Sequence, residues 1–354
     1  MEININQILQ QGIDCGASDI FVVAGLPLTF KVQGEQHRMQ EQGSLSPQDT
    51  QNFAAAIYRL AGREAVCVQG SATDDDFSFS LAGVGRFRVN LYRQRGSIGA
   101  VVRVIRFGLP TAEEMQIPPE VMRVADLKKG VALITGCAGS GKSTTLACLV
   151  NRINHTRSGH ILTLEDPVEY IHRHEKCIVS QREIPIDCPS YVAALRGALR
   201  ESPDVILLGE MRDKETMEVA MSAAETGQLL LSSLHTTGAA NTIDRIIDAF
   251  PPNQQPQIRL QLSMVLQAVI SQQLVPDVNG NVIPAFEIMT VTPAIRNMIR
   301  ENKVPQIDGV VYSSNREDMI SMDSSLLKLY QEGKITKETA LVYASNPEML
   351  QKRL

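Results

Sequence analysis

The sequence contains no tryptophan, and only 5% of its 354 residues are aromatic. It also has no uncharged apolar run of the roughly 18 residues that a membrane-spanning helix needs. The stretch Leu260–Val275 comes nearest, but its glutamines predict one polar face of a buried helix instead. The start, Met1-Glu2-Ile3-Asn4, lacks a basic segment followed by an apolar one, so we expect no secretory signal. The six cysteines form no C-x-x-C pair, which excludes the usual zinc-ribbon spacing and favours a reducing cytoplasm.

Neither sign of charge is in large excess, because 34 basic and 39 acidic residues give a net charge of −5. A mildly acidic chain is a poor candidate for a protein specialised in nucleic acid, although a local basic groove stays compatible with it. Apolar residues make up 44% of the chain, enough for a packed core. At roughly 100–200 residues per domain, the length suggests two or three domains.

Residues 1–107 predict a mixed α+β domain with largely antiparallel strands. Ser46 before Pro47 is typical of a helix start, and Gly83-Val84-Gly85 is typical of a turn between paired strands. The predicted helices cover 4–15 and 47–60, and the predicted strands cover 19–24, 28–33, 76–81 and 86–92.

Residues 108–119 contain three prolines and are the expected interdomain linker. From 120 to 354 we expect a second domain of α/β class whose C-terminal part, after about residue 250, is mainly helical. Short apolar runs alternate with helical segments there, as in a parallel sheet covered on both faces. The predicted strands are Val131–Thr135, His160–Leu164, Asp204–Leu208 and Leu229–Ser233.

The segment Gly136-Cys137-Ala138-Gly139-Ser140-Gly141-Lys142-Ser143 matches the G-x-x-x-x-G-K-[ST] loop, with Thr144 next, between a predicted strand and a predicted helix. Glycines let successive backbone N–H groups point at one anion, and the helix N-terminus adds partial positive charge. Lys142 would reach the β- and γ-phosphates, and the Ser143 hydroxyl would bind Mg²⁺. The sequence therefore predicts a site for ATP and Mg²⁺.

Three predicted strands end in polar residues that should meet at the phosphate edge of the sheet. Glu210 is the first choice for activating water, and with Ser143 it is also expected to bind Mg²⁺. Glu165 is the second choice, as a ligand of a Mg²⁺-bound water or as a residue that orients the attacking water. His235 would sense the γ-phosphate. The plainer alternatives are solvated loop acids for the two glutamates and a structural histidine for His235.

Residues 86–106 contain six arginines and no acidic residue. Alternation places Arg86, Arg88 and Asn90 on one strand face, opposite three apolar side chains. Three interpretations stay open: contact with the nucleotide from this or a neighbouring subunit, a solvated basic face, or single-stranded nucleic acid. We favour phosphate contact, through Arg88 and Arg103, because the segment lacks an aromatic platform beyond Phe87, Tyr92 and Phe107.

In this order, the motifs resemble the secretion ATPases that power type IV pili and type II secretion, and among them the pilus retraction members. The resemblance covers essentially the whole chain. The matching segments are the phosphate loop 136–145, an Asp box at 161–170, an atypical Walker B at 204–213, a His box at 223–237, the retraction signature 294–301, and the N-terminal segments 17–20 and 85–90.

This resemblance implies a homohexamer of subunits with a PAS-like N-terminal domain and a RecA-like ATPase domain. It implies a motor that hydrolyses ATP with Mg²⁺ and drives an inner-membrane platform protein to retract a pilus, giving twitching motility. The motor would be cytoplasmic and would reach the membrane only through that partner. Arginines of the N-terminal domain close on ATP in this family, and Arg88 and Arg103 match them. Assembly ATPases usually carry a further N-terminal domain and a four-cysteine zinc site, so retraction is favoured.

Three departures from the family pattern stand out. The loop has Gly-Cys-Ala-Gly where Gly-Pro-Thr-Gly is usual, Gln228 replaces the first His of the His box, and the segment 318–323 differs. The alternatives are therefore a related type II secretion or pilus-assembly ATPase, or a nucleotide-gated binding ring with little turnover. A nucleic-acid translocase is a third alternative, against which the acidic balance argues.

Overall fold

The computed structural model describes residues 4–32, 34–40, 43–81, 83–105, 108–314, 316 and 318–354. The chain divides into two compact units, Met1–Gly108 and Leu109–Leu354. Each unit is described by itself.

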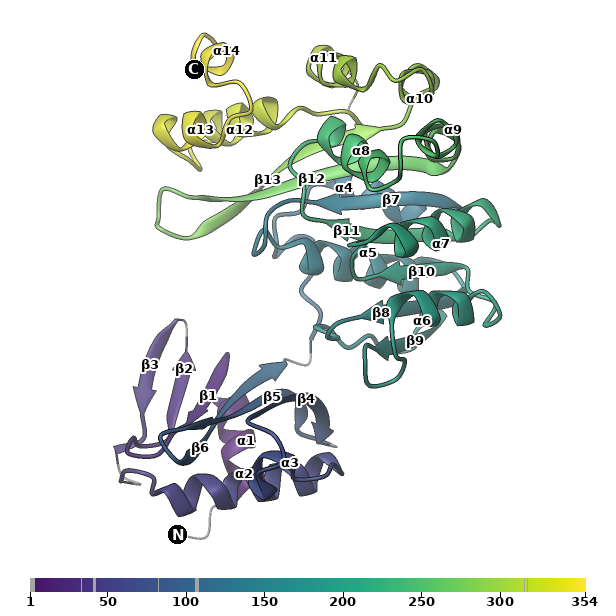
Figure 1. Ribbon diagram of the computed structural model, residues 1–354. Helices are drawn as coiled ribbons and strands as arrows, with labels where there is room; N and C mark the ends of the chain where they lie inside the picture. Colours follow the sequence, from purple (N-terminus) through teal and green to yellow (C-terminus); the bar gives the residue numbers. More distant parts are fainter. Residues whose placement is uncertain are drawn as a thin grey trace. The chain divides into compact units, whose positions relative to one another are not determined.

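In the described part of the first unit, six antiparallel strands form one sheet in the order β3-β2-β1-β6-β5-β4 (Figure 1). The helices α1, α2 and α3 pack their apolar side chains onto it, so that Leu9, Phe53 and Phe87 are fully buried. The elements are α1 (Ile5–Asp14), β1 (Asp19–Val22), β2 (Thr29–Val32), β3 (Glu35–Arg38), α2 (Pro47–Ala61), α3 (Val66–Gln69), β4 (Asp74–Leu81), β5 (Gly85–Gln94) and β6 (Ser97–Ile105).

The expected α+β character of this unit is confirmed, and local sequence signals explain most of it. Ser46 caps α2, since its hydroxyl accepts the Asp49 N–H while the Asp49 carboxylate accepts the Ser46 N–H at 2.8 Å. The predicted alternation in β5 is also confirmed, with Phe87, Val89 and Leu91 buried. β3 and β6 were not predicted: β3 is polar and exposed throughout, so no apolar alternation marks it.

Among the described residues of the second unit, seven strands form a sheet in the order β13-β12-β7-β11-β10-β8-β9. Every neighbouring pair is parallel except β12 and β13. The strands are β7 (Gly130–Thr135), β8 (Gly159–Glu165), β9 (Cys177–Glu183), β10 (Val205–Leu208), β11 (Leu229–Leu234), β12 (Leu266–Pro276) and β13 (Val282–Thr290). The four parallel strands expected from the sequence are thus confirmed, and they are adjacent.

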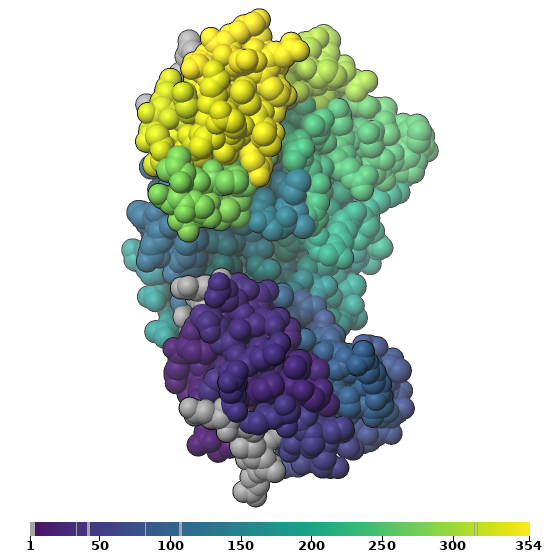
Figure 2. All heavy atoms as spheres, turned by 90° about the vertical axis from the view of Figure 1, so that its left-hand side faces the viewer, coloured from purple at the N-terminus to yellow at the C-terminus, as the bar shows by residue number. Residues whose placement is uncertain are grey.

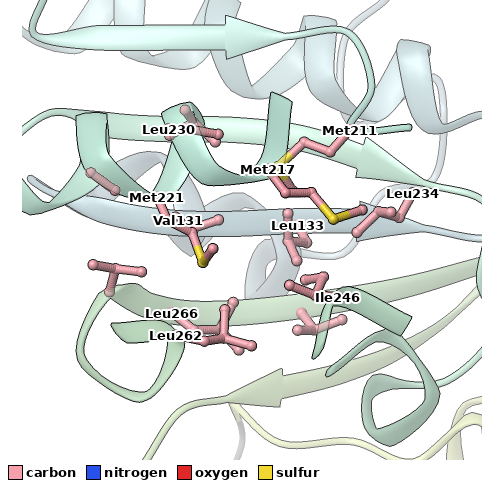
Figure 3. Packing of buried hydrophobic residues seen from close by; sticks show 14 of the residues in the cluster. Val131, Leu133, Met211, Met217, Met221, Leu230, Leu234, Ile246, Leu262 and Leu266 are labelled. Carbon is pink, nitrogen blue, oxygen red and sulfur yellow. The ribbon is translucent and has the colours of Figure 1, made fainter. Parts of the chain in front are cut away.

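Helices cover both faces of this sheet, as its apolar strands require. One face packs against α6 (Tyr191–Ala198), α7 (Lys214–Glu225), α8 (Ala239–Asp248) and α9 (Gln255–Val265). Figure 3 shows Met217 and Met221 of α7 among Val131 and Leu133 of β7 and Leu230 of β11. The other face packs against α4 (Pro119–Met122), the 3₁₀ turn η2 (Arg123–Asp126) and α5 (Lys142–Thr156). Burying each such side chain contributes on the order of 1.5–3 kcal/mol.

The expected helix over Leu260–Val275 is wrong in its larger part. α9 ends at Val265, and β12 begins at Leu266 and runs beside β7. The glutamine spacing suggested a helical polar face, but Gln272 is buried and hydrogen-bonded. β12 pairs with β7, and this tertiary pairing favours an extended chain, so it overrides the helical spacing of the glutamines.

The chain after β13 is helical, as expected, although β12 and β13 themselves also follow residue 250. The helices α10 (Pro293–Arg300) and α11 (Ile307–Ser313), with the 3₁₀ turn η3 (Val304–Gln306), join the core that α8 and α9 form. The last three helices, α12 (Met322–Gln331), α13 (Lys337–Tyr343) and α14 (Pro347–Gln351), pack on the extended ends of β12 and β13. Figure 2 shows this yellow segment as one continuous mass against the green one.

The segment 108–119 has little regular structure, and a few of its residues pack within the second unit. Ile117 is buried there, and the Cys148 thiol donates to the Pro110 carbonyl at 3.2 Å. In the part of the chain that the structure describes, no helix has the length and apolarity to cross a bilayer.

Candidate functional site

The phosphate loop connects β7 to α5, which begins at Lys142. Gly136 has φ +144°, and a Cβ there would overlap the backbone oxygen of Gln272 on β12, so only glycine fits. Gly141 precedes α5 with φ +85°, in the left-handed region that glycine adopts without strain. The predicted strand–loop–helix context of the motif is therefore present.

A cavity of about 400 Å³ opens above this loop. It brings together most of the residues that the sequence singled out: Ala138, Gly139, Gly141, Lys142, Ser143, Thr144, Glu165, Glu210 and His235 all line it. Two predicted loop residues, Gly136 and Ser140, do not line the cavity, and Ser140 is buried. The cavity lies at the carboxyl ends of β8, β10 and β11, as parallel-sheet topology predicts.

Lys142 is the first residue of α5, and its side chain contacts the phosphate loop. Its ammonium donates to the carbonyls of Gly136 at 2.9 Å and Cys137 at 2.8 Å, and it lies 3.5 Å from Nδ1 of His235. Burial lowers the pKa of Lys142. Because an ammonium can only donate, Nδ1 of His235 accepts from it, and the ring proton is therefore on Nε2.

Glu210 follows β10, and its side chain is only 12% exposed. Oε2 lies 3.3 Å from Nε2 of His235, and Oε1 lies 2.5 Å from a guanidinium nitrogen of Arg212. The side chains of Lys142, His235, Glu210 and Arg212 thus form one continuous polar chain across the cavity wall. Each oxygen of the Glu210 carboxylate keeps a second lone pair that can accept a proton from water.

Glu165 ends β8 on the same side of the sheet. Burial raises the pKa of its carboxyl to about 7. Gln181 on β9 orients the surrounding loop, because its amide donates to the Tyr170 carbonyl at 2.8 Å and lies 3.4 Å from Oε1 of Glu165. The Tyr170 hydroxyl in turn lies 2.8 Å from the hydroxyl of Thr144. The loop after β8 is thereby tied to the phosphate loop.

The donor set fits a Mg²⁺ ion. The Ser143 hydroxyl is exposed in the cavity and makes no hydrogen bond among the described residues, and the carboxylates of Glu165 and Glu210 line the same cavity. Hydroxyl and carboxylate oxygens are the ligands that Mg²⁺ prefers. Ser143 and Glu210 would hold the ion, and it would neutralise charge on the phosphates.

Some lining residues were missed by sequence reasoning. Tyr191, at the start of α6, lines the cavity, and burial raises the pKa of its phenol. His172 lines it as well, is 7% exposed, and has a pKa lowered to about 4 by burial. Neither residue follows a strand or belongs to a motif, so no local signal marks it. Arg212 lies within the Walker B segment 204–213, but the sequence alone assigns it no role.

Gln228 lies away from this cavity within the subunit. It precedes β11, whereas His235 follows the same strand, so roughly 20 Å of strand separates them at 3.3 Å per residue. Its amide oxygen accepts from the Thr226 hydroxyl at 2.7 Å. The replacement of histidine by Gln228 therefore leaves the cavity of its own subunit unchanged.

Arg88 and Arg103 lie in the first unit, directly opposite one another on β5 and β6. Arg88 forms a two-pronged ion pair with Asp76, at 3.0 and 2.6 Å, and Arg103 contacts Asp19 at 3.1 Å. Their contact with a nucleotide stays a prediction. Arg106 and Phe107 lie outside the described residues.

Comparisons with known proteins identify the family of this chain. The profile of type II/IV secretion system proteins matches residues 1–303. The chain is 43% identical over 345 residues to the type IV pilus retraction ATPase PilT of Pseudomonas aeruginosa, which covers 98% of this chain and 99% of that protein. It is 46% identical over 322 residues to a twitching motility protein of Neisseria gonorrhoeae, covering 91% of this chain and 85% of that one.

Among solved structures, the crystal structure of the pilus retraction motor PilT with bound ADP superimposes with a TM-score of 0.89. That similarity covers 99% of this chain and 100% of the other, at 42% identity. The RecA-like ATPase fold expected from the sequence is therefore confirmed. On motifs, cavity and whole-chain similarity together, the chain belongs to the ATPases of the type II/IV secretion system protein family.

Proposed function

We propose that this protein is a Mg²⁺-dependent ATPase that works as a homohexameric motor for type IV pilus retraction. The observation that carries the proposal is the polar chain from Lys142 through His235 to Glu210, which lines the cavity above the phosphate loop. A phosphate loop alone explains binding, whereas a shielded carboxylate beside it explains turnover.

The reaction follows from these positions. The loop N–H groups and Lys142 hold the β- and γ-phosphates. Ser143 and Glu210 would hold Mg²⁺, which would supply positive charge to neutralise the phosphates. Oxygen of a water molecule bonds to the γ-phosphorus as the bond to the β–γ bridging oxygen breaks. Glu210 takes a proton from this water, and ADP and phosphate leave. Glu165 orients the water, and His235 senses the γ-phosphate through its contacts with Lys142 and Glu210.

The first unit would contribute to the motor through Arg88 and Arg103. Guanidinium groups stabilise charge on a transferring phosphoryl group when they reach it from a neighbouring domain. The two side chains lie on the same face of the sheet, where each is ion-paired with an aspartate, Asp76 or Asp19. Replacing Arg103 by Ala should then lower kcat in the assembled ring and leave nucleotide affinity of the monomer unchanged.

The partner of the ring would be an inner-membrane platform protein, and the ring would work at the cytoplasmic face through it. The helix α10 carries the segment that resembles the retraction signature. Arg296 fastens this helix to α9, donating to the carbonyls of Ser263 at 2.6 Å and Met264 at 3.0 Å. Asn297, by contrast, is exposed. Leu260 and Met264 on α9 are also exposed, at 45% and 54%.

Because Asn297 is exposed and Arg296 contacts α9, Asn297 is the residue to replace in a test of partner binding. Replacing Asn297 by Ala should leave ATP hydrolysis unchanged and abolish twitching motility in cells. Replacing Arg296 would also break the α9–α10 contact, so it cannot separate coupling from folding. Full motility with Asn297→Ala would show that this helix does not contact the partner. Loss of ATP hydrolysis would show that the helix is needed for the structure of the ring.

A further inference from the structure

Arg212 stands two residues after Glu210, in the loop between β10 and α7. Its side chain is 71% exposed, yet its guanidinium lies 2.5 Å from Oε1 of Glu210. The loop is anchored on both sides of it. The Met211 N–H donates to the Ser233 carbonyl at 3.2 Å, and Asp213 caps α7 by accepting the Thr216 N–H at 2.9 Å.

These two hydrogen bonds fix the backbone on both sides of Arg212, and from this position its side chain contacts the Glu210 carboxylate. Glu210 is then held at both oxygens, at Oε1 by Arg212 and at Oε2 by His235. An ion pair with one partner this exposed contributes little to folding stability. Its effect is on orientation, because two donors on different oxygens stop the carboxylate from rotating.

We propose that Arg212 is a positioning residue that holds Glu210 in the orientation needed to take a proton from the attacking water. This inference rests on the proposed function and deepens it. A general base contributes roughly 10²–10⁴-fold to a rate, and only in a fixed geometry. Removing the contact with Arg212 should therefore lower kcat by part of that factor and leave nucleotide binding intact.

The alternative is that Arg212 binds the phosphates directly, since it lines the same cavity. A phosphate ligand would act on substrate affinity, whereas a positioning residue acts on turnover. The two roles therefore differ in the parameter that changes, KM or kcat.

The test uses the full-length protein with Arg212→Ala and Arg212→Lys. The matched control is Arg196→Ala, since Arg196 forms an exposed ion pair with Glu215 at 3.1 Å. Affinity for a fluorescent ATP analogue, KM and kcat are measured for each. We expect Arg212→Ala to lower kcat by about 10- to 100-fold with KM within about twofold, a fraction of the general-base factor. The kcat of Arg212→Lys should lie between those of Arg212→Ala and wild type, and Arg196→Ala should have wild-type kcat and KM.

Two further measurements separate positioning from a merely structural role. Added guanidinium ion at non-denaturing concentration should restore part of the kcat of Arg212→Ala, because the vacated place is open to solvent. In a Glu210→Gln background, Arg212→Ala should cause no additional loss, since both changes act through one group.

Wild-type kcat in Arg212→Ala would overturn the inference. So would a rise in KM at unchanged kcat, which would make Arg212 a phosphate ligand. A loss that guanidinium does not restore, accompanied by lost nucleotide binding, would assign it a structural role. Absence of hydrolysis by the wild-type hexamer would instead overturn the proposed function, and this inference with it, before any variant is compared.

Discussion

A buried hydrogen bond joins the first turn of α5, directly after the phosphate loop, to β12, a strand that the sequence did not predict. The hydroxyl of Thr145, in the first turn of α5, donates to the amide oxygen of Gln272 on β12 at 2.7 Å. Thr145 is fully buried, and Gln272 is 3% exposed. Neither group can exchange its partner for water, so the bond should stabilise the loop measurably.

The perturbation is a cycle of three variants: Thr145→Val, Gln272→Met and both together. Each single change removes the bond and leaves one buried polar group unpaired, which costs about 1–3 kcal/mol. The double change removes both polar groups at similar volume. It should therefore cost less than the sum of the single changes, by an interaction energy of about 0.5–3 kcal/mol.

Urea unfolding provides the assay. The transition that moves when Mg²⁺ and ADP are added belongs to the unit that holds the nucleotide, and its midpoint is compared among the variants. Single changes with wild-type midpoints, or a double change that equals their sum, would refute the reasoning. The first result would mean that the groups reach water, and the second that they do not interact.

Three further predictions concern the cavity. Glu210→Gln should keep ATP-analogue binding and lower kcat by roughly 10²–10⁴-fold, and wild-type turnover would contradict its assignment as base. Gly136→Ala should weaken ADP binding about tenfold or more, because its Cβ meets backbone of Gln272, whereas Gly139→Ala has open space around it and should cost less; equal losses would contradict this. Burial lowers the pKa of His172 from 6.5 to about 4, so below pH 6.5 the unfolded chain takes up a proton that the folded chain refuses. The free energy of unfolding should fall by up to about 3 kcal/mol as the pH drops through that window, and His172→Gln should abolish this part of the pH dependence in urea titrations.

The central strands of the second unit could be predicted because each is a short apolar run that is buried on both faces. β12 could not, since its glutamines mimic a helical period. Their real function is set by tertiary partners: Gln272 bonds to a residue 127 positions away, and Gln267 accepts from Arg296 at 3.0 Å. Single-sequence periodicity does not contain such pairings.

The site divides in the same way. The phosphate loop, Glu165, Glu210 and His235 could be predicted because motif spacing and strand ends bring them to one edge of a parallel sheet. His172 could not, because it reaches the cavity through the loop after β8, which Gln181 holds in place by accepting the His172 N–H at 2.7 Å. The orientation of Glu210 also depends on side-chain contacts that spacing alone does not give.

The most direct test of the motor is steady-state ATP hydrolysis measured against protein concentration, with the mass of the assembly determined on the same samples. We predict a hexamer whose rate per subunit rises on assembly, because a site completed by a neighbour's arginines needs that neighbour. A folded protein that binds ATP but hydrolyses none at any concentration, or hydrolyses it equally well as a monomer, would contradict the account.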